Sequence, residues 1–259
     1  MAFKLGNRLI ERVQFGYAEG ISDGVLRYVL NQLKDSAINI TAEANEHKDA
    51  EGNLVKKSYK NKAGTYEAKN AWVNTNIVAA TSGAEVQYGS SANKITAPKI
   101  VVVPAGTKTL SVTGAVEGSI KVAAYDENNG SGETFKKGTA ASATEFAIAT
   151  NTLTLPTVTN TQFIVKYDRT MDTGAVIANE VDKFPKSVKL TLKALYYDVC
   201  DKDTLKGCYI VLPSFQISPE ISLPLNAETE MDFKGDLEVD YCGTKKVLYY
   251  FYDVADDED

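Results

Sequence analysis

Hydrophobic and polar positions alternate along most of the chain, which is the pattern of strands with one buried face. Ile38 and Ile40 lie between polar neighbours, and Val188, Leu190 and Leu192 alternate with lysine and threonine. Clusters of Gly, Asn and Asp separate such runs, as at residues 49–53. The pattern predicts a mainly β fold, either a β-sandwich or an open barrel.

One early segment has a helical period instead. Ser22 is a suitable N-cap, and Asp23 falls in the first turn. The apolar residues that would share one helix face are Val25, Leu26, Val29, Leu30 and Leu33. The spacing predicts one flanking helix over about residues 23–34.

The middle of the chain has a different composition. Residues 95–170 are rich in Thr, Ala, Ser and Val and contain short apolar runs with turn signals between them. Regularly spaced short strands are typical of a β-sandwich of immunoglobulin type. We therefore expect an inserted immunoglobulin-like domain at 95–170, within a discontinuous β-domain formed by 1–94 and 171–259.

Motifs for catalysis and metal binding are missing from the sequence. His47 is the only histidine, and no G-x-S-x-G, P-loop, HExxH or EF-hand pattern occurs. The three cysteines, Cys200, Cys208 and Cys242, have no CxxC spacing, so we interpret them as reduced thiols. We expect a non-enzymatic protein without cofactor or metal, although a hydrolase that uses only carboxylates stays open.

The N-terminus and the longest apolar runs bear on location. The first residues contain no uninterrupted apolar core of a secretory signal, and no run approaches 18 apolar residues. We expect a chain made in the cytoplasm that has no membrane partner.

The net charge of −6 is concentrated near the C-terminus. Residues 171–259 contain 9 basic and 18 acidic residues, a net charge of −9. Around Lys234 and Gly235, interpreted as a tight turn, acidic residues alternate with apolar ones. One face of the predicted hairpin would then present six carboxylates: Glu228, Glu230, Asp232, Asp236, Glu238 and Asp240.

Such a face has several interpretations. It is a solvated sheet surface, a calcium cluster, or the acidic lining of a channel that DNA passes without binding. Direct nucleic-acid binding is disfavoured by a pI near 5.1. The aromatic run 248–252 fits either a subunit contact or a strand buried on both faces, and Trp72 is expected to be packed within a strand.

The order of these elements resembles phage tail tube proteins. The resemblance rests on the segment SDGVLRYVLNQLKD, on the predicted hairpin from INITAEANEHK to KNAWVN, and on the late segment EMDFKGDLEVDYC. It implies a β-sandwich or open barrel that assembles into rings, usually hexameric, which stack into a virion tube with an acidic lumen for DNA.

The resemblance also implies roles for individual residues. The six carboxylates around Lys234 would face the lumen. The loop at 49–62, with Lys56, Lys57, Lys60 and Lys62, would contact the next ring. Copies of the chain itself and other virion proteins would be the partners.

Two alternatives stay open beside a tail tube subunit. One is a capsid decoration protein or another virion structural protein, and the other is a surface or carbohydrate-binding β-sandwich module.

Overall fold

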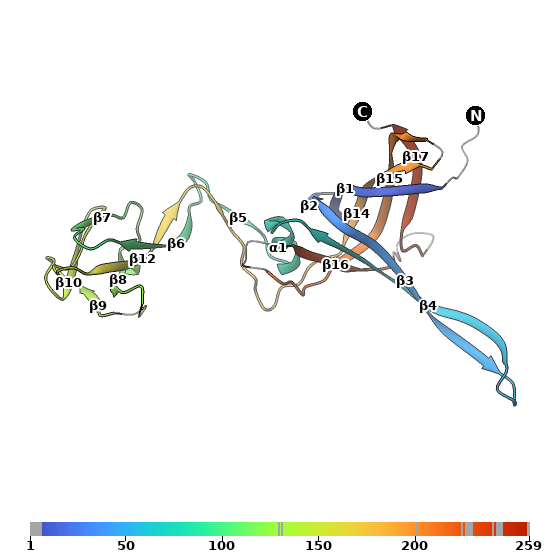
Figure 1. Ribbon diagram of the computed structural model, residues 1–259, viewed down its shortest axis with the longest axis horizontal. Helices are drawn as coiled ribbons and strands as arrows, with labels where there is room; N and C mark the ends of the chain where they lie inside the picture. Colours follow the sequence, from blue (N-terminus) through green and yellow to red (C-terminus); the bar gives the residue numbers. More distant parts are fainter. Residues whose placement is uncertain are drawn as a thin grey trace. The chain divides into compact units, whose positions relative to one another are not determined.

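A computed structural model of the 259-residue chain describes residues 7–128, 130, 132–199, 201–223, 225, 230–239, 241 and 246–257. The chain divides into two compact units. The larger unit combines Met1–Glu85 with Ile177–Asp259, and the smaller unit is the continuous stretch Val86–Val176. Figure 1 shows the elements of both.

The larger unit contains an eight-stranded sheet and an α-helix. Its elements are β1 (Arg8–Gly20), β2 (Leu26–Asn31), β3 (Leu33–Lys48), β4 (Leu54–Asn70), α1 (Thr75–Ser82), β14 (Val188–Asp198), β15 (Asp201–Ile217), β16 (Met231–Leu237) and β17 (Tyr250–Asp257). The strand order is β2-β1-β14-β15-β16-β4-β3, and β17 pairs with β15 beside β16. The sheet curls toward a barrel, so the predicted mainly β sandwich or open-barrel fold is confirmed.

The predicted helix at 23–34 is wrong. Residues 21–23 form a turn, after which the Asp23 carboxylate accepts a hydrogen bond from the Val25 amide and Gly24 has a φ of +65°. Leu26–Asn31 is then strand β2, whose Tyr28 and Leu30 are buried while Arg27 and Val29 are exposed. An i, i+4 spacing also fits a strand, because residues separated by an even number of positions lie on the same face of a strand.

Among the described residues the α-helix is Thr75–Ser82, although the alternation of Val73, Thr75 and Ile77 alone favours a strand there. The Asn74 side chain caps it by accepting from the Asn76 amide, and Gly83 ends it with a φ of +64°. Ile77 is fully buried against the core of the larger unit. No helix in the described chain is long and apolar enough to cross a membrane.

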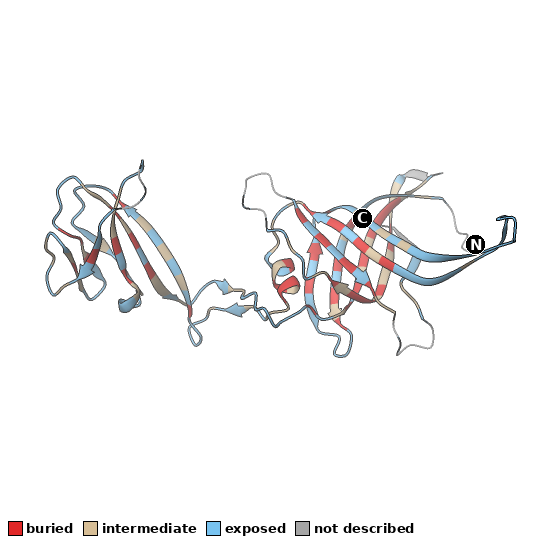
Figure 2. Ribbon diagram, turned by 90° about the horizontal axis from the view of Figure 1, so that it is seen from below, coloured by how far each residue is buried: buried red, intermediate tan, exposed pale blue. Residues whose placement is uncertain are grey.

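Aromatic side chains form the centre of the larger core. The Phe233 ring lies 5.6 Å from Phe215, 5.9 Å from Tyr66 and 6.4 Å from Tyr28, measured between centroids. All four residues are buried, and three of the four strands that supply them are consecutive in the sheet. Figure 2 shows buried residues along the strands of this sheet and in α1, while the outer part of the β3–β4 hairpin is exposed.

The smaller unit has its own sheets and core. Its elements are β5 (Gln87–Tyr88), β6 (Ile95–Val103), β7 (Thr109–Ser111), the 3₁₀ turn η1 (Glu117–Ser119), β8 (Lys121–Tyr125), β9 (Thr134–Lys137), β10 (Glu145–Ala149), β11 (Thr152–Thr154), β12 (Gln162–Met171) and β13 (Ala175–Val176). Seven strands follow the order β6-β12-β8-β9-β10-β11-β7, and they enclose Phe135, Phe146 and Phe163. The β9–β10 pair is parallel. The immunoglobulin-like assignment of residues 95–170 stays a prediction.

Strands β5 and β13 form a separate antiparallel pair at the two ends of the smaller unit. Gln87 lies opposite Val176, so the chain enters and leaves this unit at neighbouring points. Insertions of this kind leave the host sheet continuous, because the two ends of the host chain stay close together.

Candidate assembly and passage surfaces

The acidic segment around Lys234 is a single strand, so the predicted tight turn and hairpin are wrong. Met231–Leu237 runs through Lys234 and Gly235 without a break, pairing with β4 on one side and with the end of β15 on the other. Buried and exposed residues alternate along it, with Met231, Phe233 and Leu237 on the core face. Asp232 and Asp236 therefore share the opposite, exposed face with Lys234.

Lysine side chains lie between the carboxylates on this exposed face. Asp232 lies opposite Lys69 of β4, and Lys234 lies opposite Glu67, so acidic and basic positions alternate across the two strands. Lys234 also pairs with Glu220 at 3.0 Å. Opposite charges at facing positions stabilise strand pairing by a few tenths of a kcal/mol. The described face is thus of mixed charge and not a continuous row of carboxylates.

Two further carboxylates of the predicted set are held by neighbours. Glu230 forms ion pairs with Lys34 at 3.2 Å and Lys69 at 3.4 Å, and these lysines lower its pKa. Glu238 accepts hydrogen bonds from the Ser187 and Ser214 hydroxyls at 2.6 and 2.9 Å. Glu228 and Asp240 lie outside the described residues.

The four predicted contact lysines lie on a strand and not in a loop. The turn is confined to Asp49–Asn53, where the Asp49 carboxylate accepts from the Glu51 and Asn53 amides, and β4 begins at Leu54. These hydrogen bonds lower the pKa of Asp49, and the one from the Asn53 amide has the largest effect. We call the projecting hairpin, residues 41–63, the arm. The β4 strand of the arm carries Lys56, Lys57, Lys60 and Lys62.

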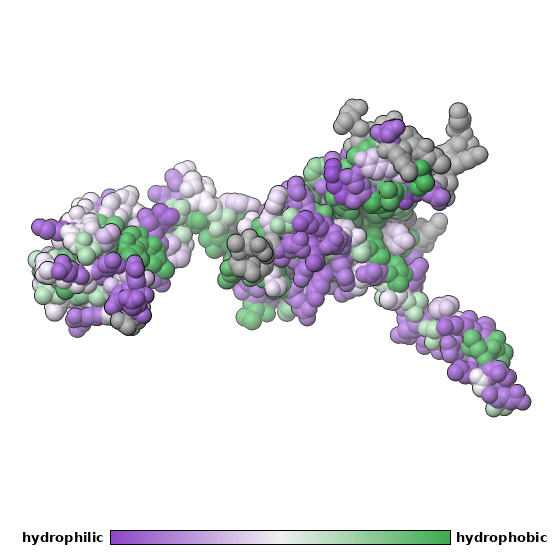
Figure 3. Space-filling model, in the orientation of Figure 1, coloured by the Kyte–Doolittle hydropathy of each residue, from purple (hydrophilic) through white to green (hydrophobic). Residues whose placement is uncertain are grey.

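Cross-strand contacts order the arm. Lys57 pairs with Glu46 at 3.2 Å, Lys60 lies opposite Glu43, and His47 lies opposite Lys56. The residues of the arm are exposed apart from Ser58, which is half-buried. Its apolar side chains are exposed as well, with Leu54 at 55%, Val55 at 69% and Tyr59 at 67%. Figure 3 shows apolar surface on this otherwise hydrophilic hairpin.

The barrel is open between β1 and β3. Strand β1 pairs with β14 along its whole length, but with β2 only from Phe15 to Glu19. Among the described strands, none pairs with the other edge of β1 at Leu9–Gln14, and β3 pairs with β4 alone. A cleft of about 990 Å³ separates the two edges and is lined by Ile10–Phe15 and Asn31–Ser36. We call this the open edge.

Local irregularities keep β1 and β3 from pairing at the open edge. Register shifts interrupt β1 between Ile10 and Arg12 and again between Val13 and Phe15. On the facing side Gln32 and Asp35 have positive φ values of 57° and 50°. Bulges and left-handed residues turn a strand away from a regular ladder, so the two edges diverge. The Gln14 side-chain oxygen lies buried here without a hydrogen-bond partner among the described residues.

An apolar groove of about 270 Å³ lies on the core side of the open edge. Ile10 and Val13 of β1, Ile38 of β3, and Tyr249 and Phe251 at β17 are among its lining residues. Ile10 is 49% exposed and Phe251 is 45% exposed. The aromatic run of β17 is therefore half-exposed, and the interpretation of a strand buried on both faces is wrong.

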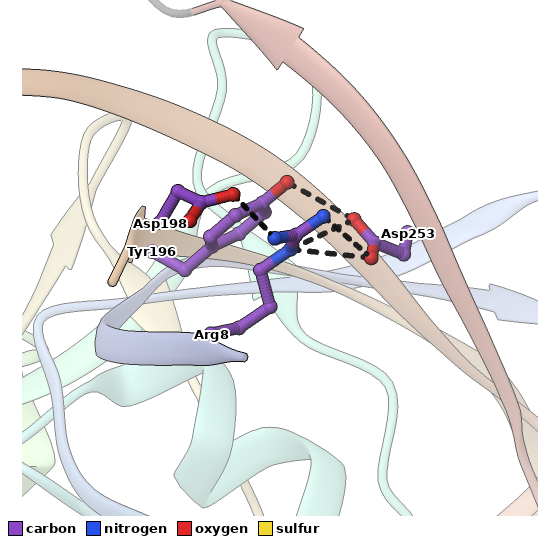
Figure 4. A network of polar contacts seen from close by, with 4 residues as sticks. All are labelled: Arg8, Tyr196, Asp198 and Asp253. Atoms are coloured by element: carbon purple, nitrogen blue, oxygen red, sulfur yellow. Dashed lines mark hydrogen bonds and ion pairs between the residues drawn. The ribbon is translucent and has the colours of Figure 1, made fainter. Parts of the chain in front are cut away.

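A polar cluster ties the first strand to the last (Figure 4). The Arg8 guanidinium donates to Asp198 at 2.6 Å and to Asp253 at 3.2 Å, and it lies 5.0 Å from the centre of the Tyr196 ring. The Tyr196 hydroxyl donates to the other oxygen of Asp253 at 3.0 Å. These contacts hold β17 against β1 and β14, which fixes one wall of the groove.

Burial raises the pKa of two groups in and beside this cluster, the Tyr196 hydroxyl and the Cys208 thiol. Desolvation, with the Asp253 hydrogen bond, raises the pKa of Tyr196 to about 12, and desolvation raises the pKa of the Cys208 thiol to about 11. Cys208 is free and buried, as the interpretation of reduced thiols requires, whereas Cys200 and Cys242 lie outside the described residues. Trp72 is 51% exposed just beyond β4, so the expectation that it is packed within a strand is wrong.

Sequence patterns alone did not reveal the open edge or the Arg8 cluster. The two edges of the cleft are at least 16 positions apart in the chain and Arg8 lies 190 positions from Asp198, and no local motif marks either feature. Across the described residues, no group of three or more His, Cys, Asp and Glu side chains is placed to hold a metal ion.

Comparison with protein families finds a match to most of the chain. The model of the YomU/Tube protein family matches residues 9–247, which include both units and both edges of the cleft. Curated proteins provide no match to the chain.

Proposed function

We propose that this chain, which belongs to the YomU/Tube family of phage tube-like structural proteins, is a tail tube subunit whose copies form stacked rings around a passage for DNA. The family match over residues 9–247 carries the proposal, because membership implies a virion component that assembles with other virion proteins. The match also favours a tube over a capsid decoration protein or a carbohydrate-binding module.

The unpaired strand edges support self-assembly. An exposed edge offers backbone donors and acceptors to another chain, and proteins normally cover or pair it. Here the edge of β1 and an exposed arm lie on different parts of the same unit. Contacts between unlike surfaces of identical copies close into rings, or continue as filaments, depending on the rotation between copies. Hexameric rings are the arrangement we propose.

Electron microscopy of the purified chain tests the proposal. We expect negative-stain images to show rings or hollow tubes at high protein concentration, because the unpaired edge of β1 and the exposed arm would both contact other copies. Closed particles with no central channel, or a monomer at all concentrations in sedimentation velocity, would contradict it.

For the passage we propose the mixed-charge face of β16 described above, with the predicted carboxylates Glu228, Glu230, Asp232, Asp236, Glu238 and Asp240 as the acidic groups that DNA would meet. A lumen of the same charge as DNA repels the phosphates and lets the duplex slide. Within this set Asp232 and Asp236 are the best probes. The Glu230 carboxylate is instead paired with lysines, and the Glu238 carboxylate accepts hydrogen bonds from serine hydroxyls.

Phage carrying Asp232→Asn together with Asp236→Asn are expected to eject DNA about twofold or more slowly, because each copy loses two repelling charges. The fold should persist, since both side chains are exposed. Ejection is followed by dye binding to released DNA. The matched control, Glu133→Gln with Asp172→Asn, removes two exposed charges from the smaller unit and should leave the rate unchanged. Equal ejection rates for the aspartate variant and the control would show that Asp232 and Asp236 do not line the passage.

A further inference from the structure

Strand β6 is an uncovered edge of the smaller unit. It is nine residues long, and among the described strands it pairs with β12 alone. Its Ile100 and Val102 side chains are 63% and 47% exposed. A long apolar edge strand invites pairing with another extended chain, and proteins usually cover or interrupt such an edge. The other edge of the sheet, β7, has three residues, so β6 is the better site for an added strand.

Hydrogen bonds of β12 show which backbone groups of β6 point to the free side. The Asp168 amide donates to the Ser119 hydroxyl, and the Asp168 carbonyl oxygen accepts from the backbone amide that precedes η1. Asp168 therefore turns its backbone away from β6, and Pro98, which lies opposite it, turns its own backbone away from β12. A proline fits this direction because it has no N–H to give to a ladder. Residues two and four positions further along point the same way, so Ile100 and Val102 present N–H and C=O groups on the free edge.

The exposed face beside this edge is basic where Ile100 lies. Lys166 of β12 lies opposite Ile100, and Lys121 of β8 lies opposite Lys166, so two exposed lysines face each other. Neither lysine forms an ion pair within the described part of the chain. Asp168 is the one acidic residue of β6, β8 and β12, and it lies one row away, opposite Pro98. Like charges at facing positions destabilise strand pairing, and a carboxylate from a partner would offset that repulsion.

An apolar row lies next to the lysine row. Val102 lies opposite Ile164 of β12, and Ile164 lies opposite Ala123 of β8. A strand added to β6 would therefore meet lysine at one position and apolar surface two positions away on the same face. Strands two places apart in a sheet are separated by about 10 Å, a distance that a glutamate and a lysine side chain span together.

We propose that the free edge of β6 binds an extended acidic segment of another protein, which adds a strand to the seven-stranded sheet. The backbone of the incoming strand pairs with Ile100 and Val102, its carboxylate lies beside Lys166, and an apolar side chain two positions away packs on Val102. The inference goes beyond the proposed tube function, because it gives the smaller unit a partner of its own.

Binding of designed peptides to the full chain tests the proposal. The probe is a fluorescein-labelled seven-residue peptide of threonine and valine with one central glutamate, and its matched counterpart has lysine at that position. By fluorescence anisotropy the glutamate peptide should bind about fivefold or more tightly than the lysine peptide, because it places an opposite rather than a like charge beside Lys166. Hydrogen exchange measured by mass spectrometry should slow in residues 96–103 when the glutamate peptide is bound.

Variants of the chain separate the backbone contact from the charge contact. Ile100→Pro removes an N–H from the free edge and should weaken binding about tenfold or more, whereas Ile100→Ala keeps that N–H and should weaken it less than about threefold. Lys166→Glu should reverse the preference, so that the lysine peptide binds more tightly. Lys108→Glu, at an exposed position outside these three strands, should leave the preference unchanged. Circular dichroism checks that each variant folds.

The outcomes are distinct. Equal affinity for the two peptides, or slowed exchange that maps outside residues 96–103, would overturn the proposal. If a second copy covers the edge instead, neither peptide would bind and Ile100→Pro would lower the sedimentation coefficient of the chain, which would overturn it as well. The measurements do not require rings or tubes, so their failure leaves the proposed tube function intact.

Discussion

Replacing Phe233 by alanine is expected to lower the free energy of unfolding of the larger unit by about 3–5 kcal/mol. The Phe233 ring is 1% exposed and contacts three other buried aromatic rings, at centroid distances between 5.6 and 6.4 Å. Removing it leaves a cavity that these neighbours fill only in part, because Phe215, Tyr66 and Tyr28 are each fixed to a different strand. Urea unfolding followed by tyrosine fluorescence measures the change.

Two controls accompany this measurement. Phe15→Ala removes the same ring from a position that is 48% exposed, so its cost should stay below about 1 kcal/mol. The smaller unit has a separate core, built around Phe135, Phe146 and Phe163, and its transition should not move. A Phe233→Ala protein as stable as Phe15→Ala would show that the aromatic cluster is not the centre of the larger core.

The strands with one buried face were predictable from local pattern. Leu190 and Leu192, for example, are fully buried as their alternation with Lys189 and Thr191 indicates. The same reasoning failed at residues 23–34, where apolar residues four positions apart fit both a helix and a strand. There the deciding interaction is the pairing of Tyr17 with Val29 across β1 and β2, which no local window contains.

The helix at Thr75–Ser82 was missed for the opposite reason. The alternation of Val73, Thr75 and Ile77 suggests a strand, although Asn74 and Gly83 are good capping residues at the two ends of the helix. The capping residues Asn74 and Gly83, and not the alternation, mark this helix in the sequence.

The candidate site was less predictable than the fold. The alternation of acidic and apolar residues correctly places Asp232 and Asp236 on one exposed face. The pairing of that face with Lys69 and Glu67 depends on β4, more than 150 positions earlier in the chain. The open edge likewise depends on where β2 stops pairing with β1, a property of tertiary structure and not of either strand's sequence.

Gly235 shows why a local turn signal misled, and it supplies a second test. The Lys234–Gly235 pair resembles a turn, yet Gly235 lies within β16, opposite Tyr66 and Ile217. A Cβ atom at this position would lie 2.5 Å from Cζ of Phe215 and still closer to the Gln216 carbonyl oxygen. A glycine inside a strand often marks such a close approach.

We therefore expect Gly235→Ala to lower the free energy of unfolding of the larger unit by about 1–3 kcal/mol, through overpacking against Phe215 and the backbone of β15. Gly118→Ala is the matched control, because a Cβ there would meet nothing within 4 Å, and its effect should be about zero or slightly stabilising. Urea unfolding of the two variants compares them. If Gly235→Ala were as stable as Gly118→Ala, β16 would not pack as closely on β15, and the segment would be free to adopt the turn that its local sequence suggests.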